Sequence, residues 1–210
     1  MTSEALGVSG RSETLRLYHV LLATRTEGPG LRAAVWVQGC PNHCKGCMAP
    51  ETWSFTDGFP MDVSELAEEI LATPALEGVT LAGGEPFAQA APLASLAQRL
   101  RVHGLGVITF TGYTLAQLKA QHSPGTDALL AATDLLIDGP YIETLACDDR
   151  PWVGSSNQAY HFLTDRYRES VAAYKRQKNK LELRILPDGR VIANGMLPEA
   201  ALRAIKNFQK

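Results

Sequence analysis

Between residues 31 and 140 the chain alternates short apolar runs with segments of helical periodicity, and this alternation limits the possible folds more than any other feature. The apolar runs end in glycine-containing turns, and the segments between them carry apolar residues three or four positions apart. This pattern predicts a parallel sheet whose strands are joined by right-handed helical crossovers. The expected strands cover 31–38, 78–82, 106–110 and 134–138, and the expected helices begin at 62 and cover 88–103 and 115–121.

The number of repeats separates a closed barrel from an open sheet. We count four or five strand-helix repeats, fewer than the eight of a closed TIM barrel. The expected fold class is therefore α/β, with an incomplete (partial) TIM-type barrel or an open, curved, mostly parallel sheet. A further strand is expected at 15–22. After Asn157 the pattern changes to a C-terminal helix-hairpin-helix extension, with a helix over 164–180, strands over 181–186 and 190–193, and a helix over 198–208.

The length of 210 residues suits one domain with a sizeable core. Residues 1–14 are expected to form a flexible N-terminal arm, because their Ser, Thr, Glu and Gly side chains offer little to bury. Residues 15–210 then form the single domain. Its core covers about 18–158, and the extension covers 159–210.

The composition argues against two classes of partner. The formal net charge is -2, with 45% hydrophobic and 20% charged residues, so no overall field attracts nucleic acid. No apolar run reaches the roughly 18 residues of a membrane span, and the N-terminus lacks a secretory signal pattern. We expect a cytoplasmic protein with reduced cysteines, without a membrane or nucleic-acid partner.

Three cysteines, Cys40, Cys44 and Cys47, lie within eight residues directly after the strand at 31–38. An odd number of thiols in so tight a loop is unsuited to disulfides. Zinc usually has a fourth ligand nearby or a second CxxC motif, and none follows. The spacing favours one 4Fe-4S cluster with three thiolate ligands and one open iron, and a zinc site or a chance cluster of buried cysteines are the alternatives.

A second motif, Gly83-Gly84-Glu85-Pro86, lies between an expected strand and an expected helix. Two residues without side chains allow close approach of the backbone to a ligand, and Glu85 can accept from a cationic group. Taken alone, the motif is typical of an ordinary turn between a strand and a helix. Its place one strand after the cysteines favours a binding role, because sites in parallel sheets form at the carboxyl ends of the strands.

The CxxxCxxC spacing resembles the signature of radical S-adenosylmethionine (SAM) enzymes, and Gly83-Gly84-Glu85 resembles their GGE motif. In those enzymes the open iron is chelated by the amino and carboxylate groups of the methionine moiety. The resemblance implies that residues 15–210 are a radical SAM domain that binds S-adenosyl-L-methionine. It gives Glu85 and the neighbouring backbone the task of holding the methionine amino group.

Further motifs resemble those of anaerobic ribonucleotide reductase activating proteins, within the wider group of glycyl radical enzyme activases. They lie in the same order between about Tyr18 and Gln158: Glu27-Gly28-Pro29-Gly30-Leu31-Arg32, Gln38-Gly39-Cys40, Lys45-Gly46-Cys47, Thr111-Gly112-Tyr113-Thr114, Asp138-Gly139-Pro140 and Trp152-Val153-Gly154-Ser155-Ser156-Asn157-Gln158. The resemblance implies reductive cleavage of SAM to a 5'-deoxyadenosyl radical, which generates a glycyl radical on a large partner enzyme. It also implies an electron donor of the flavodoxin or ferredoxin type.

Tyr113, Asp138, Ser155 and Asn157 are further candidates for cofactor binding, because they lie at strand ends or in the polar run before Gln158. Each also has an ordinary structural interpretation as a packed tyrosine, a turn-forming aspartate or a loop that hydrogen-bonds to itself. Cys147 is expected to be a bystander thiol.

Two other functions remain open from the sequence alone. The first is a radical SAM enzyme that modifies a peptide or small molecule directly, and the second is a zinc- or cluster-bearing binding module without turnover. The basic run from Arg166 to Lys180 is either a solvated helix face or a docking surface for an acidic patch on the partner.

Overall fold

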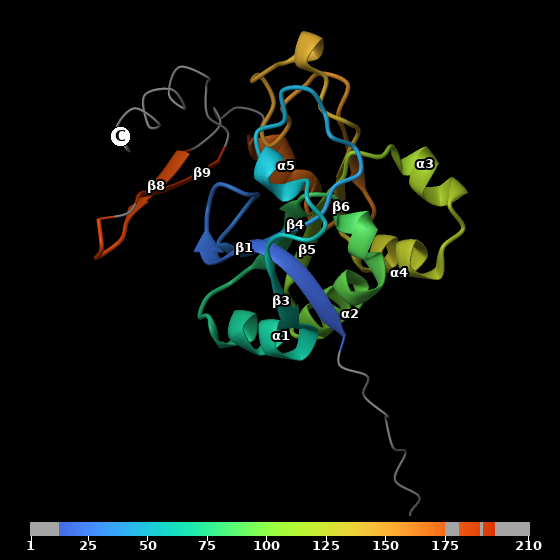
Figure 1. Cartoon of the computed structure of the whole chain (residues 1–210). Coiled ribbons are helices and arrows are strands. Elements are labelled where there is room, and N and C mark those ends of the chain that lie inside the picture. The colour runs from blue at the N-terminus through green and yellow to red at the C-terminus, as the bar shows by residue number, and fades with distance from the viewer. Residues whose placement is uncertain (1–12, 175–180, 190, 196–210) are drawn as a thin grey trace, which may run out of the picture.

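The computed structural model describes residues 13–174, 181–189 and 191–195. In this part of the chain, a seven-stranded sheet has the order β3-β1-β2-β4-β5-β6-β7 (Figure 1). Its strands are β1 (Thr14–Thr24), β2 (Arg32–Val37), β3 (Phe59–Asp62), β4 (Gly78–Gly83), β5 (Gly106–Phe110), β6 (Leu135–Asp138) and β7 (Ala159–Phe162).

The centre of the sheet is parallel, as the alternation predicts. Strands β2, β4, β5 and β6 pair in parallel, whereas β1, β3 and β7 add antiparallel edges. Among the described residues, the two outermost strands, β3 and β7, do not pair with each other, so the sheet is open and does not close into a barrel. The α/β class and the mostly parallel open sheet are confirmed.

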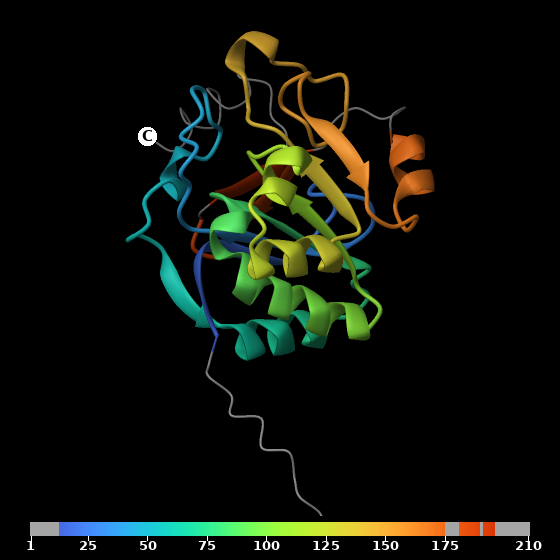
Figure 2. The same ribbon diagram turned by 90° about the vertical axis from the view of Figure 1, so that its right-hand side faces the viewer.

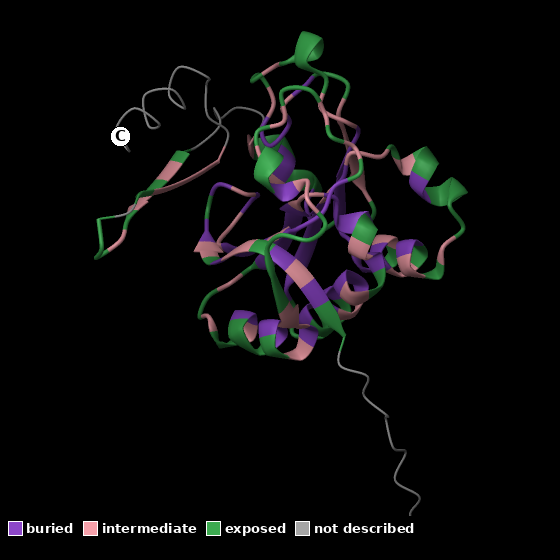
Figure 3. Cartoon of the chain, viewed as in Figure 1, coloured by how far each residue is buried: buried purple, intermediate pink, exposed green. Residues whose placement is uncertain are grey.

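One face of the sheet is covered by three helices, which lie side by side in Figure 2. They are α1 (Val63–Ala72), α2 (Ala90–Val102) and α4 (Pro124–Ala132). The Asp62 carboxylate caps α1 by accepting from the backbone N–H groups of Ser64 and Glu65, which fixes where the helix begins. The inward residues of these helices and the strand residues beneath them form the main core, drawn purple in Figure 3.

A smaller core covers the opposite face. Ile108, Leu135 and Ile137 point from β5 and β6 toward a cluster that includes Trp152 and Tyr167. Helix α5 (Arg168–Tyr174) contributes Val171 to this cluster. Burial on both faces explains why the central strands read as continuous apolar runs.

Arg32, at the start of β2, is wholly buried beneath this second layer. Its guanidinium donates to the Thr80 hydroxyl at 2.7 Å and to the Tyr167 hydroxyl at 3.0 Å, and it lies over the Tyr167 ring. A buried arginine needs such a set of partners because its charge cannot be lost. Arg32 therefore ties the sheet to the segment that precedes α5.

Helix α4 was not among the helices expected from the sequence, because Ser123-Pro124-Gly125 follows α3 (Leu115–Ala120) and is a typical helix-breaking sequence. The structure shows that Pro124 instead occupies the first turn of a new helix. A proline is tolerated there because the first N–H groups of a helix have no partner within the helix. Pro124 therefore marks the start of α4, four residues after the end of α3.

The C-terminal extension is described only in part. The hairpin of β8 (Leu181–Ile185) and β9 (Val191–Gly195) is present as expected, and α5 begins at Arg168, inside the predicted helix over 164–180. The predicted last helix over 198–208 and the basic residues of 175–180 lie outside the described residues. Residues 1–12 of the predicted arm also lie outside the described residues. Thr14, the last residue of the predicted arm, belongs to β1 and pairs with Asp62 of β3.

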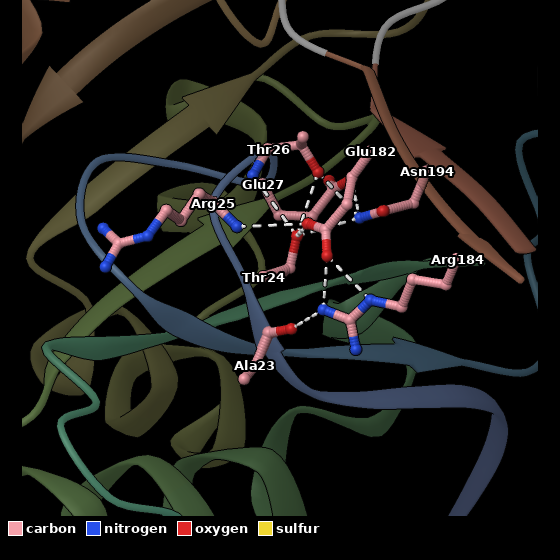
Figure 4. A network of polar contacts seen from close by, with 8 residues as sticks. All are labelled: Ala23, Thr24, Arg25, Thr26, Glu27, Glu182, Arg184 and Asn194. Atoms are coloured by element: carbon pink, nitrogen blue, oxygen red, sulfur yellow. Dashed lines mark hydrogen bonds and ion pairs between the residues drawn. The ribbon is translucent and has the colours of Figure 1, made fainter.

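A network of polar side chains joins this hairpin to the loop after β1 (Figure 4). The Asn194 amide donates to the hydroxyls of Thr24 and Thr26 at 3.1 and 2.7 Å and to the Glu27 carboxylate at 3.2 Å. The Thr24 hydroxyl donates to Glu182 at 2.7 Å. Burial raises the pKa of the Glu27 carboxyl, so the hairpin supplies donors to a group that lies largely out of water.

We expect Asn194→Ala to lower the free energy of unfolding by about 1–3 kcal/mol, because it leaves a buried carboxylate short of a donor. Urea denaturation measures the loss, and limited proteolysis reports release of the hairpin. Leu183→Ala is the matched control, because Leu183 lies on β8 with its side chain half exposed. Equal stability of the Asn194 variant and the parent would show that the network does not hold the hairpin.

Candidate functional site

The three cysteines lie on the loop that leaves the carboxyl end of β2, as the sequence predicts. The start of this loop forms hydrogen bonds with the segment around the short helix η1 (Pro50–Thr52). The backbone N–H of Cys40 donates to the Trp53 carbonyl at 3.1 Å, and that of Gly39 donates to the Thr52 carbonyl at 2.8 Å. The Gln38 side chain adds two hydrogen bonds to carbonyls of the same segment. The start of the cysteine loop is therefore fixed before the first thiol.

The environments of the thiols differ. Cys40 is buried, whereas Cys44 and Cys47 are partly exposed, and all of them are free. Burial raises the pKa of the Cys40 thiol, and hydrogen bonds from the backbone N–H groups of Asn42 and His43 oppose that rise. Backbone donors aimed at a sulfur stabilise a thiolate, the form that binds a metal.

Within the described ranges, no three Cys, His, Asp or Glu side chains are gathered closely enough to hold a metal ion. The cysteine loop therefore offers a suitable set of donors without displaying their coordination geometry. Three thiols on one loop, with N–H donors directed at the first of them, fit the chemistry of a 4Fe-4S cluster. The ligand set of Cys40, Cys44 and Cys47 remains a prediction.

Glu85 lies at the centre of the site, and its side chain is wholly buried. One carboxylate oxygen accepts from the Phe87 N–H at 3.0 Å and the Thr111 hydroxyl at 2.9 Å. The other accepts from the Gly112 N–H at 2.8 Å and the Asn42 amide at 3.1 Å. Burial raises the pKa of this carboxyl, and the four donors oppose the rise.

Through these contacts Glu85 joins three separate parts of the chain. Asn42 belongs to the cysteine loop, Phe87 to the start of the short helix η2 (Pro86–Gln89), and Thr111 to the loop after β5. The backbone N–H of Glu85 also donates to the Gly39 carbonyl at 2.9 Å. The two motifs that the sequence singled out are therefore in direct contact.

The glycines of this region allow close packing of backbone on backbone. A Cβ on Gly84 would lie 2.3 Å from the Gly39 carbonyl oxygen, and one on Gly112 would lie 2.4 Å from the Asn42 amide nitrogen. Gly83 has a φ of +103°, where other residues are strained. The sequence suggested that Gly83 and Gly84 allow close approach of a ligand, and in the structure Gly84 and Gly112 also pack against the cysteine loop.

A cavity of about 150 Å³ opens beside Glu85 at the carboxyl ends of β4, β5 and β6. Its lining includes the predicted site residues Gly83 and Gly84, together with Tyr141 and Gln158, which were not among the predicted site residues. Tyr141 directly follows the Asp138-Gly139-Pro140 motif, and Gln158 ends the motif that begins at Trp152. Their places in or beside these motifs were the sequence feature that could have identified them as site residues. The full lining is Gly83, Gly84, Pro86, Phe110, Thr111, Gly112, Gly139, Tyr141 and Gln158.

Asp138 and Tyr113 lie close to this edge, but their contacts are with the protein. The Asp138 carboxylate accepts from the Leu115 N–H at 2.6 Å, at the start of α3, and lies 2.8 Å from His161 Nε2. The Tyr113 carbonyl accepts from the Gly139 N–H, and its side chain packs against the main core. Both residues therefore stabilise the loops around the cavity.

The polar run after Gly154 closes a loop. The Ser155 hydroxyl accepts from the Ile142 N–H, and the Asn157 amide donates to the Pro140 carbonyl. The Gln158 amide oxygen accepts from two backbone N–H groups of the same run, while its nitrogen donates to the Gly139 carbonyl. These bonds hold the run against the loop after β6, and Gln158 also lines the cavity.

The loop after β6 lies beside the cysteine loop. Lys45 Nζ is 3.0 Å from Glu143 Oε2, and a Cβ on Gly46 would lie 3.1 Å from the Tyr141 ring. Cys147 packs at the edge of the second core, away from Glu85's partners. The site is therefore framed by four loops, which follow β2, β4, β5 and β6.

Comparison with known proteins identifies the class first. A family model described as a 4Fe-4S single cluster domain matches residues 26–161, which include the cysteine loop and the four parallel strands. The matched range covers more than half of the chain and ends before α5 and the hairpin.

The relatives identify the particular family. The chain is 34% identical over 146 residues to the anaerobic ribonucleoside-triphosphate reductase-activating protein of Vibrio cholerae, covering 65% of this chain and 91% of that protein. The protein of the same name from Escherichia coli K12 is 32% identical over 147 residues, with the same coverage. The one from bacteriophage T4 is 32% identical over 145 residues, covering 66% and 88%. The chain belongs to the family of anaerobic ribonucleoside-triphosphate reductase-activating proteins.

Among solved structures, QueE from Escherichia coli aligns with 48% of this chain and 53% of its own, at 21% identity and a TM-score of 0.40. A likeness this weak carries no argument. No helix among the described residues is long and apolar enough to cross a membrane.

Proposed function

We propose that the protein is a radical SAM activase that generates a glycyl radical on a partner enzyme, anaerobic ribonucleoside-triphosphate reductase. The single observation that carries this proposal is the direct contact between the cysteine loop and the Gly83–Glu85 turn, through Asn42 and Gly39, in a chain of this family. It joins the proposed cluster ligands to the proposed cofactor site at one edge of the sheet.

In the proposal, Cys40, Cys44 and Cys47 hold one 4Fe-4S cluster and leave one iron open. When bound, the cluster would supply one electron for cleavage of S-adenosylmethionine to methionine and a 5'-deoxyadenosyl radical, and this radical would take a hydrogen atom from a backbone glycine of the partner. The cofactor would be surrounded by Gly83, Gly84, Glu85, Tyr113, Asp138, Ser155 and Asn157.

These residues would act in different ways. Gly83 and Gly84 line the cavity and present backbone groups there, whereas Tyr113, Asp138, Ser155 and Asn157 fix the loops that frame it. Both oxygens of Glu85 already accept two hydrogen bonds, so an ammonium group would have to replace one of the present donors. Asn42 is the half-buried side chain among them, which makes its amide the easiest to displace.

The wider parts of the proposal rest on the family. A flavodoxin- or ferredoxin-type protein would donate the electron, and four free thiols are consistent with action in the cytoplasm. Residues 15–210 would work as one radical SAM domain on a partial-barrel scaffold, with a core of 18–158 and an extension of 159–210. Of the basic run, Arg166 donates to two carbonyls and Arg168 pairs with Asp165, so docking of the partner through these two side chains would have to replace or share exposed contacts.

The test is anaerobic reconstitution with iron and sulfide, followed by reduction in the presence of S-adenosylmethionine. We expect four irons per chain, and release of methionine and 5'-deoxyadenosine. Addition of an anaerobic ribonucleotide reductase should give a glycyl radical detectable by electron paramagnetic resonance.

The outcomes separate the alternatives. A zinc or cluster module would bind metal without cleaving the cofactor. An enzyme acting directly on a peptide or small molecule would cleave the cofactor and leave the reductase without a radical. Either result would overturn the activase proposal.

A further inference from the structure

The indole N–H of Trp53 is a buried donor without a hydrogen-bond partner in the part of the chain that the structure describes. Leaving a buried donor unpaired costs about 1–3 kcal/mol. Native proteins contain few such groups, and an unsatisfied one points to a ligand, an ion or a water that completes it. The position of Trp53 indicates which kind of acceptor is available.

Trp53 lies against the turn that carries the first two cysteines. Its backbone carbonyl accepts from the Cys40 N–H at 3.1 Å. Its ring stacks on the ring of His43, which directly precedes Cys44, with centroids 4.7 Å apart and an interplanar angle of 19°. Trp53 therefore contacts both ends of this turn, with its backbone at Cys40 and with its indole ring at His43.

The stacking also limits what the N–H can reach. An indole N–H lies in the plane of its ring, so in a nearly parallel stack it is not directed at the His43 ring. A phenylalanine would provide a similar stacked surface without a donor. What tryptophan adds at this position is the N–H itself.

We propose that the Trp53 indole N–H donates a hydrogen bond to a sulfur of the cluster, either a cysteine thiolate or a bridging sulfide. This inference rests on the proposed function, because it requires the cluster. Hydrogen bonds to the sulfurs help to set the reduction potential of iron-sulfur clusters. A donor stabilises the more negative, reduced state most, so Trp53 raises the potential and makes the cluster easier to reduce.

The first test is Trp53→Phe, which keeps an aromatic ring and removes the donor. The reconstituted protein should hold the same amount of iron and be about tenfold harder to reduce, equivalent to a midpoint potential about 59 mV more negative for one electron. Redox titration followed by electron paramagnetic resonance measures this without cofactor or partner. Trp36→Phe is the matched control, because it makes the same change on β2, where the ring packs on His19 and not on the cysteine loop, and its potential should match that of the parent.

A second measurement uses the unaltered chain, so it does not depend on how the variant folds. Protein labelled with indole nitrogen-15 should show coupling between a tryptophan nitrogen, its exchangeable proton and the reduced cluster in pulsed electron paramagnetic resonance. The parent potential in Trp53→Phe, or no such coupling in the labelled parent, would overturn the assignment. Failure of the parent itself to bind a cluster would instead refute the proposed function.

Discussion

Replacement of Cys40, Cys44 or Cys47 by alanine is expected to abolish a stable 4Fe-4S cluster, whereas Cys147→Ala should leave the iron content at the level of the parent. A cluster with three protein ligands and one open iron has no spare thiolate, so the loss of one ligand removes the site. Cys147 packs at the edge of the second core and lies outside the cysteine loop. Iron and sulfide analysis after anaerobic reconstitution measures the effect.

The fold provides its own control for these variants. Cys44 and Cys47 are partly exposed in a loop, so their replacement should change the free energy of unfolding by no more than about 0.5 kcal/mol. Cys40 is buried, so its replacement by alanine should lower the free energy of unfolding somewhat more. Loss of iron with unchanged circular dichroism therefore reports ligation. Equal iron loss in all four variants, Cys147→Ala included, would contradict the assignment of three ligands.

The sequence was sufficient to predict the central strands, because each is an apolar run that ends in a turn. The expected ranges for β5 and for the two hairpin strands agree closely with the structure. It failed at β3, which contains Pro60 and forms an edge only because β1 lies beside it. Edge strands such as β3 and β7 depend on a distant partner, which a local pattern does not encode.

The site was predicted in position but not in its contacts. The order of the strands placed the cysteine loop and Glu85 at one edge of the sheet, and in the structure Asn42 of that loop contacts Glu85. No local pattern could show that Asn42, Phe87, Thr111 and Gly112 all donate to one carboxylate, because three segments of the chain supply them. For the same reason, the unpaired indole of Trp53 was visible only once the cysteine loop had been placed beside it.

Glu85→Ala is expected to lower the free energy of unfolding by about 2–6 kcal/mol. The change leaves the backbone N–H of Phe87 and the hydroxyl of Thr111 without their acceptor, and each of these buried groups costs about 1–3 kcal/mol when it is left unpaired. Total stability is about 5–15 kcal/mol for a typical domain, so this loss is large. Urea denaturation of the cluster-free protein gives the value without any contribution from iron or cofactor.

Asn42→Ala is the variant that separates the structural role of Glu85 from its proposed role in binding. It removes one donor from a single carboxylate oxygen, while Thr111, Phe87 and Gly112 keep theirs. Because Asn42 is half-buried, water can replace its amide, and the cost in stability should be about 1 kcal/mol or less.

If Glu85 accepts from the methionine amino group, the freed oxygen should leave the affinity for S-adenosylmethionine equal to that of the parent or higher. Equilibrium dialysis of the reconstituted Asn42→Ala protein measures it. Weaker binding in a variant that folds normally and holds its cluster would mean that Asn42 itself contacts the cofactor, and that Glu85 serves to hold the cysteine loop in place.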